Sequence, residues 1–83
     1  MMLDVTEVNK RFAASLRWHR LQQGKSRDEL SGASGVCRRT IQNYEQGRTN
    51  PSLYNVILLA DALRIPLAEL ANIEGGIKYA ERG

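Results

Sequence analysis

The segment 26–47, SRDELSGASGVCRRTIQNYEQG, constrains the fold of this 83-residue chain more than any other part. Ser26 and Glu29 have the spacing of a capping box, in which two side chains satisfy backbone N–H groups at a helix start. Gly35 then interrupts the helix, because glycine tolerates the left-handed conformation that ends helices. A second helix is expected over 38–46, ending at Gly47. The segment therefore predicts two short helices joined by a tight turn.

Helical spacing of apolar residues extends through the rest of the chain. A buried stripe predicts a first helix over 5–23: Val5, Val8, Phe12, Leu16 and His19. In the central segment, the inward positions are expected to be Leu30, Ala33, Val36, Ile41 and Tyr44. The most apolar helix should follow Ser52, with core positions Leu53, Val56, Ile57, Ala60 and Leu63. Pro66 suits the opening of a fifth helix that carries Leu67, Leu70 and Ile73.

These patterns predict an all-α domain of five helices. No alternating pattern typical of a strand competes with them. The domain is expected to cover residues 1–73. A tail over 74–83 follows, which opens with the hinge-like pair Gly75-Gly76 and is flexible or associated with a dimer.

Composition excludes several classes of function. No run of 18 apolar residues is present to span a membrane, and the acidic N-terminus is not a secretory signal, so we expect a cytoplasmic protein. One cysteine and one histidine supply neither a disulfide nor a metal cluster, and no cofactor site is expected. His19 lies on an apolar face, which is typical of a packed core residue. Because no nucleophile, base and carboxylate set is present, we do not expect an enzyme.

Positive charge is concentrated in the middle of the chain. The net charge is +3, yet residues 10–48 alone hold nine Lys/Arg against three Asp/Glu. The excess lies on the segment that contains the two short helices, which is the charge distribution expected of a surface that binds phosphate. The alternative is a solvated basic face without a partner.

The second short helix presents Arg38, Arg39, Gln42 and Asn43. A capped helix, a glycine turn and a polar second helix form the layout of a helix-turn-helix, whose second helix reads bases in the major groove. Arginine can bond O6 and N7 of guanine, and asparagine pairs with adenine in the same two-pronged manner. Gln42 can reach a base or a phosphate, and Thr40 suits a phosphate contact.

Residues 12–70 resemble the Cro/repressor-type (XRE-like) helix-turn-helix domain that lambdoid phage repressors share. The matching positions, in chain order, are Leu16, Arg20, Ser26, Glu29-Leu30, Gly35-Val36, Thr40-Ile41, Tyr44-Glu45, Gly47, Pro51-Ser52-Leu53, Leu59-Ala60, Ala62-Leu63, Leu67 and Glu69-Leu70. The resemblance implies a compact lambda-repressor-like fold of five helices, with the recognition helix over about 38–46 in the major groove of double-stranded DNA.

The resemblance also implies roles for other residues. Arg27 stands where a helix residue, often glutamine, clamps the DNA backbone, and Arg48 is a second candidate for phosphate. Further phosphate candidates are Lys25 and Arg17. In the family, an arginine of the first helix pairs with the glutamate that ends the recognition helix, which implies an Arg20–Glu45 pair here.

Two residues depart from what is expected at their positions. Arg64 stands where a glycine usually ends the fourth helix, so that helix is predicted to end without a left-handed cap. Cys37 occupies the start of the recognition helix, where Ser, Thr, Asp or Asn is a better cap. The thiol is either a tolerated small residue or a redox switch with a lowered pKa.

A transcriptional regulator acting on DNA as a homodimer is the function we expect, in a bacterium or phage and associated with the nucleoid. One short helix reads few base pairs, so two-fold sites are needed to recover affinity. Candidate residues for the dimer surface or tail packing are Trp18, Leu58, Ile73, Ile77 and Tyr79. Alternatives are an antitoxin, which would bind a toxin as its protein partner, and an interaction adaptor that has kept the fold but no longer reads DNA.

Overall fold

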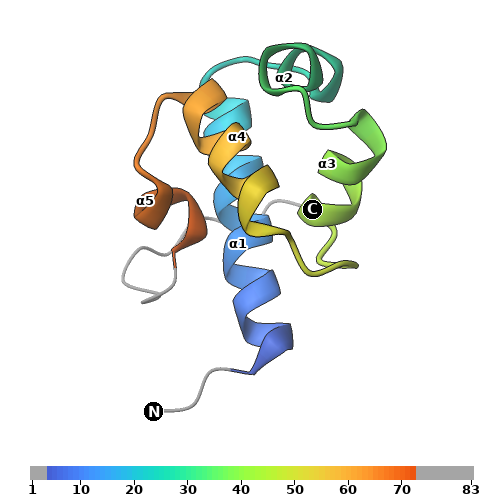
Figure 1. Cartoon of the computed structure of the whole chain (residues 1–83), viewed down its shortest axis with the longest axis vertical. Helices are drawn as coiled ribbons and strands as arrows, with labels where there is room; N and C mark the ends of the chain where they lie inside the picture. The colour runs from blue at the N-terminus through green and yellow to red at the C-terminus, as the bar shows by residue number, and fades with distance from the viewer. Residues whose placement is uncertain (1–3, 73–83) are drawn as a thin grey trace.

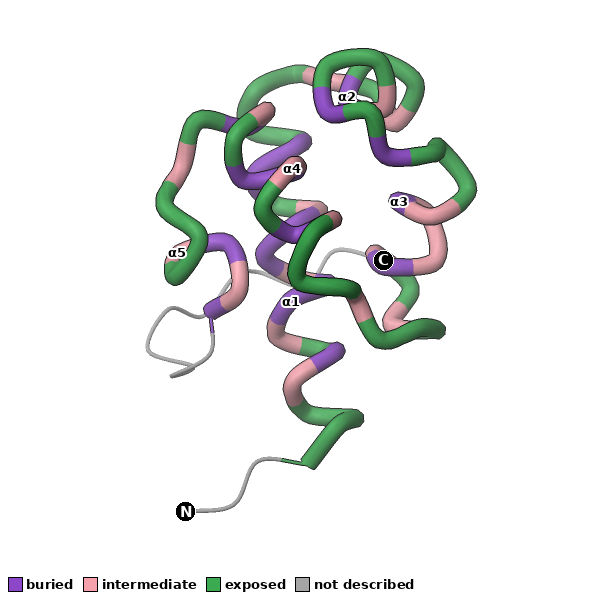
Figure 2. Tube along the Cα trace, in the orientation of Figure 1, coloured by how far each residue is buried: buried purple, intermediate pink, exposed green. Residues whose placement is uncertain are grey.

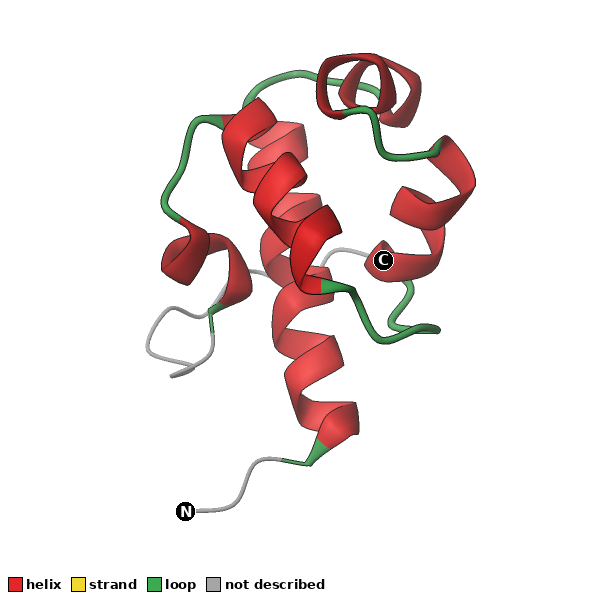
Figure 3. Cartoon of the chain, in the orientation of Figure 1, coloured by secondary structure: helices red, strands yellow, loops and turns green. Residues whose placement is uncertain are grey.

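The computed structural model describes residues 4–72, which form five helices and no strand (Figures 1 and 3). The helices are α1 (Val5–Gln22), α2 (Arg27–Ser34), α3 (Arg38–Glu45), α4 (Leu53–Leu63) and α5 (Leu67–Ala71). The all-α prediction is confirmed, and the predicted start or end residues of the first four helices agree to within one residue. No helix of the described residues is long and apolar enough to cross a membrane.

Side-chain caps explain why three of these helices begin where they do. Asp4 accepts a hydrogen bond from the Glu7 N–H at 2.9 Å and starts α1. The capping box of α2 is complete: the Glu29 N–H donates to Ser26 at 3.0 Å, and the Ser26 N–H donates to Glu29 at 2.8 Å. Hydrogen bonding of the Glu29 carboxylate by the Ser26 backbone N–H, and then by the Ser26 side chain, holds the pKa of Glu29 below its ordinary value. Ser52 starts α4 with a single cap bond, which its hydroxyl accepts from the Asn55 N–H at 3.1 Å. The helix starts are thus encoded locally.

The core is one apolar cluster to which all five helices contribute. α1 packs against α3 and α5, while α2 packs against α3 and α4. Phe12 and Tyr44 meet edge to face, with ring centroids 5.6 Å apart, and join α1 to α3. The buried members of the cluster are Phe12, Leu16, Leu30, Val36, Ile41, Tyr44, Val56, Leu59, Ala60, Leu63 and Leu70. This core holds α2 and α3 in a fixed relation across the turn at Gly35.

Four positions predicted to face the core are exposed. Val5 (59% exposed) lies in the first turn of α1, which extends past the neighbouring helices (Figure 2). Leu53 and Ile57 lie on the outer face of α4, and Leu53 is its first residue. Ala33 is exposed as well, and its neighbour Ser34 is buried instead. Helical spacing identifies an apolar face, but it does not show where the neighbouring helices stop covering it.

Leu58, a candidate for the dimer surface or for tail packing, is half-buried and packs against the core cluster. The prediction for Arg64 is corrected by the structure. Arg64 itself adopts the left-handed conformation with φ 58°, and its N–H bonds the end of α4. α4 therefore does end in a left-handed cap, although arginine is disfavoured there by about 1–2 kcal/mol.

The predictions for the tail fall on residues that the structure does not describe. They concern the boundary between 73 and 74, the glycine pair and three candidate dimer residues, Ile73, Ile77 and Tyr79.

Candidate nucleic-acid interface

Helix α3 has an apolar face and a polar face. Ile41 is fully buried and Tyr44 is 4% exposed, so this face is fixed against the core. Arg38 and Arg39 are exposed, while Gln42 and Asn43 are half-buried. On a helix, residues 38 and 42 are one turn apart, as are 39 and 43, so the four side chains form one polar strip. The strip offers charged and amide donors in two neighbouring rows.

The C-terminal end of α3 is held by a buried carboxylate with two arginine partners. Glu45 has a side chain that is 1% exposed. Arg20 donates to it twice, from Nε at 2.6 Å and from Nη2 at 2.9 Å. Nη1 of Arg20 donates to the Lys25 carbonyl oxygen at 2.9 Å. The predicted Arg20–Glu45 pair is therefore present, in a two-pronged geometry that fixes both position and orientation.

Arg27 shares the same carboxylate. Its Nε lies 3.1 Å from Oε1 of Glu45, and its side chain is 30% exposed. The residue predicted to clamp the DNA backbone thus also joins the start of α2 to the end of α3. Two guanidinium groups face one carboxylate, so the cluster of Arg20, Arg27 and Glu45 keeps one net positive charge beside the recognition helix.

The N-terminal end of α3 carries a different kind of pair. Nε of Arg38 lies 2.9 Å from Oδ1 of Asp28 on α2, with side chains 56% and 78% exposed. Sequence reasoning did not single out Asp28, because no spacing rule connects residues across a turn between helices. An exposed pair of this kind contributes about 0–1 kcal/mol to stability, so Arg38 can exchange partners at little cost.

The loop after α3 presents Arg48 from an anchored backbone. The exposed Arg48 donates its N–H to the Asn43 carbonyl oxygen at 3.0 Å. Asn50 accepts a 2.7 Å hydrogen bond from the Asn9 amide of α1. At the end of the loop, the Ser52 N–H donates to the Tyr44 hydroxyl of α3 at 3.4 Å, and the Ser52 hydroxyl accepts from the Asn55 N–H of α4 at 3.1 Å. Arg48 therefore extends from a loop that is bonded to three helices.

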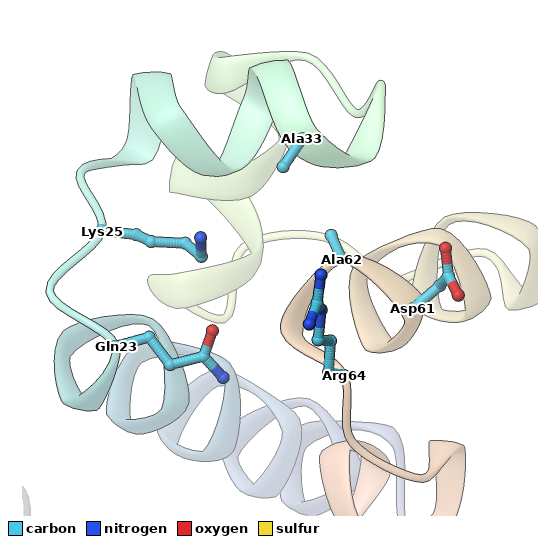
Figure 4. Close-up of a pocket in the computed structure, with 6 residues that line it drawn as sticks. All are labelled: Gln23, Lys25, Ala33, Asp61, Ala62 and Arg64. Atoms are coloured by element: carbon cyan, nitrogen blue, oxygen red, sulfur yellow. The ribbon is translucent and has the colours of Figure 1, made fainter.

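The remaining phosphate candidates are spread over the molecule. Thr40 is half-buried on α3, and Arg17 is half-buried on α1. Lys25 lines an open depression bounded by the end of α1, by α2 and by the end of α4 (Figure 4). The other residues that line it are Gln23, Ala33, Asp61, Ala62 and Arg64. No residue of α3 lines this depression.

Cys37 and His19 differ in their surroundings. Cys37 is exposed, and the backbone N–H groups of Arg39 and Thr40 at the helix start lower the pKa of its thiol. His19 is buried, with Nε2 3.4 Å from a Glu69 carboxylate oxygen. Burial lowers the pKa of His19, and the charge of Glu69 opposes that shift. His19 thus packs from α1 against α5, as predicted for a core residue.

Comparison with known proteins agrees with this geometry. The helix-turn-helix family model matches residues 16–70, which is more than half of the chain. A curated relative is the cryptic phage CTXphi transcriptional repressor RstR of Vibrio cholerae, 31% identical over 61 residues. That match covers 74% of this chain and 55% of the relative, so the chain matches about half the length of RstR.

Two solved structures share the fold. One is the restriction-modification controller protein C.AhdI of Aeromonas hydrophila, 37% identical with a TM-score of 0.72, covering 75% of this chain and 94% of that one. The other is the hypothetical transcription factor NHTF from Neisseria, 27% identical with a TM-score of 0.75, covering 86% and 82%. Each of these proteins is named as a regulator or transcription factor.

Proposed function

Because this chain belongs to the XRE-type helix-turn-helix family of transcription regulators, we propose that it represses or otherwise controls transcription by binding a specific duplex DNA sequence. The observation that carries the proposal is the polar strip of α3, in which two exposed arginines and two half-buried amides lie on a helix whose opposite face is locked into the core. The same strip argues against an adaptor that has lost DNA binding, since such an adaptor is expected to have lost the basic and amide side chains of this helix. Its place of action would be the cytoplasm, on the nucleoid.

In this proposal the strip reads base edges. Arg38 and Arg39 lie in the first turn of α3, where recognition helices approach the bases most closely. Each can contact O6 and N7 of guanine, and Asn43 can contact adenine. Gln42 reaches a base or a phosphate from the next turn. The buried cluster at Glu45 supports this role because it fixes the angle at which the strip meets the groove.

Contacts to phosphate would hold the domain in register on the duplex. Arg48 is the strongest candidate, because it is exposed beside the end of α3 on an anchored loop. Arg27 retains an exposed edge at the start of α2, and Thr40 lies on α3 itself. Arg17 on α1 and Lys25 between α1 and α2 would contribute to the general positive potential. Such contacts add affinity without reading sequence.

A homodimer on a two-fold operator would complete the function. One short helix reads only a few base pairs, and two copies about one helical turn apart on the DNA recover affinity and specificity. Exposed apolar side chains are available for such an interface on α4, namely Leu53, Tyr54 and Ile57. Trp18 on α1 is 36% exposed and remains a further candidate.

Selection from random duplexes tests the proposal. We expect the purified protein to enrich one roughly palindromic site, and Arg38→Ala and Asn43→Ala to relax the preference at separate positions of that site. Enrichment of no common sequence, or a preference that both variants leave unchanged, would contradict the proposal. Sedimentation of the protein with and without the selected duplex measures the number of copies bound.

A further inference from the structure

Asp28 is an acidic side chain on a surface that has to approach phosphates. Its carboxylate repels DNA, so at this place it calls for a physical explanation. The carboxylate lies 2.9 Å from Nε of Arg38, and both side chains are more than half exposed. An exposed pair stabilises the fold very little, so stability does not explain the contact. What the contact does provide is a preferred direction for the Arg38 side chain, with its Nε toward Asp28.

We propose that Asp28 is a positioning residue that aims the guanidinium of Arg38 at guanine, an inference that rests on the proposed function. The guanidinium is a rigid, planar fork of five N–H donors. A carboxylate at Nε occupies one side of the fork, and the two terminal nitrogens still present a pair of parallel donors. That pair is what O6 and N7 of guanine accept.

The backbone that carries Asp28 is itself well fixed. Asp28 is the second residue of α2, directly after the Ser26–Glu29 capping box begins the helix. Its neighbour Arg27 reaches Glu45 at the opposite end of α3. The first turn of α2 therefore contacts both ends of the recognition helix, through a cation at the C-terminal end and an anion at the N-terminal end.

Preorganisation is the expected benefit. A solvated arginine samples many rotamers and must be immobilised when it binds a base, which weakens binding. An arginine that Asp28 already directs loses less freedom on binding. The opposite hypothesis is that Asp28 competes with DNA for Arg38. The two hypotheses predict opposite effects of removing the charge, which makes the role of Asp28 testable.

The test measures binding to the selected duplex and to a scrambled duplex, with Asp28→Asn, Arg38→Ala and the double variant. We expect D28N to lower the selected-to-scrambled affinity ratio about fivefold, the lower end of what one two-pronged base contact contributes. Selection with D28N should relax the same base position that R38A relaxes. In the R38A background, D28N should leave the ratio unchanged. Asp61→Asn, at an exposed acid on α4, is the matched control and should have no effect on the ratio.

The remaining outcomes would overturn the positioning role of Asp28. A ratio that stays the same or rises in D28N would overturn the positioning role, and a rise would favour competition. An equal loss in the R38A background would also overturn it, because Asp28 would then act without Arg38. Failure of the proposed function is recognised separately, since the wild-type protein would then bind both duplexes equally well.

Discussion

The two ends of the recognition helix are both held by ion pairs, but the pairs differ in burial and in the number of partners. At the C-terminal end, Glu45 is 1% exposed and binds Arg20 and Arg27. At the N-terminal end, Arg38 and Asp28 are both more than half exposed. A buried carboxylate cannot exchange its partners without a large cost, whereas an exposed arginine can. One end of α3 thus sets the geometry, and the other end is free to bind a ligand.

The largest effect is expected from breaking the buried end. Glu45→Gln would leave Arg20 buried beside a neutral amide, and removal of one partner of a buried pair typically costs about 3–5 kcal/mol. We expect thermal or urea denaturation to show a loss of that size. The matched control is Glu7→Gln, which removes the pair with Arg11 one turn along α1, where the Glu7 side chain is 51% exposed, and should cost less than about 0.5 kcal/mol. Equal losses in the two variants would contradict the distinction between the ends.

A change at the exposed end should alter binding and leave stability nearly intact. Arg38→Lys keeps the charge but loses the planar fork that guanine requires. We expect it to weaken binding to the selected duplex by about 1–3 kcal/mol, with little effect on a scrambled duplex. Titration of both duplexes measures the difference. Parallel weakening on both would mean that Arg38 contacts phosphate instead of a base.

A change at Arg48 should affect neither the stability of the fold nor the base preference. Arg48→Ala removes a candidate phosphate contact, so it should reduce the slope of log affinity against log salt by about one and weaken all sequences alike. Titrations at several salt concentrations measure that slope. A relaxed base preference in this variant would place Arg48 in a groove instead of on the backbone.

The smallest effect is expected from a substitution at the end of α4, which should change stability but not DNA recognition. Arg64 adopts φ 58°, a conformation that glycine tolerates without strain. Arg64→Gly should therefore raise the free energy of unfolding by up to about 1 kcal/mol. The selected-to-scrambled ratio should stay unchanged. A changed ratio would show that the scaffold and the recognition helix are coupled more widely than through Glu45.

Local chemistry made most of the fold predictable from sequence. Caps at Ser26 and Ser52 and glycines at 24, 35 and 47 defined helix ends, because each acts on its own backbone. Apolar spacing identified the buried residues of α3. It failed at Val5 and Leu53, because exposure there depends on how far neighbouring helices extend. Arg64 was missed for another reason: arginine disfavours the left-handed conformation that it adopts, so the residue type alone argued against that cap.

The candidate site was predictable in part. The polar strip followed from helical spacing, and the Arg20–Glu45 pair followed from the family resemblance. The contacts of Arg27 with Glu45 and of Asp28 with Arg38 could not be predicted, since they depend on how the turn at Gly35 sets α2 against α3. A local pattern contains no information about such side-chain directions.

Nuclear magnetic resonance of the arginine Nε–H groups tests the division of α3 most directly. Protein labelled with nitrogen-15 would be titrated with the selected duplex, and the side-chain signals of Arg20 and Arg38 compared. We predict that the Arg38 signal shifts on binding, while the Arg20 signal, protected by Glu45, keeps its position and slow exchange with water. A large shift of the Arg20 signal together with an unchanged Arg38 signal would contradict the central claim. That claim is that the buried end of α3 fixes the helix on the domain, while the exposed end contacts the DNA bases.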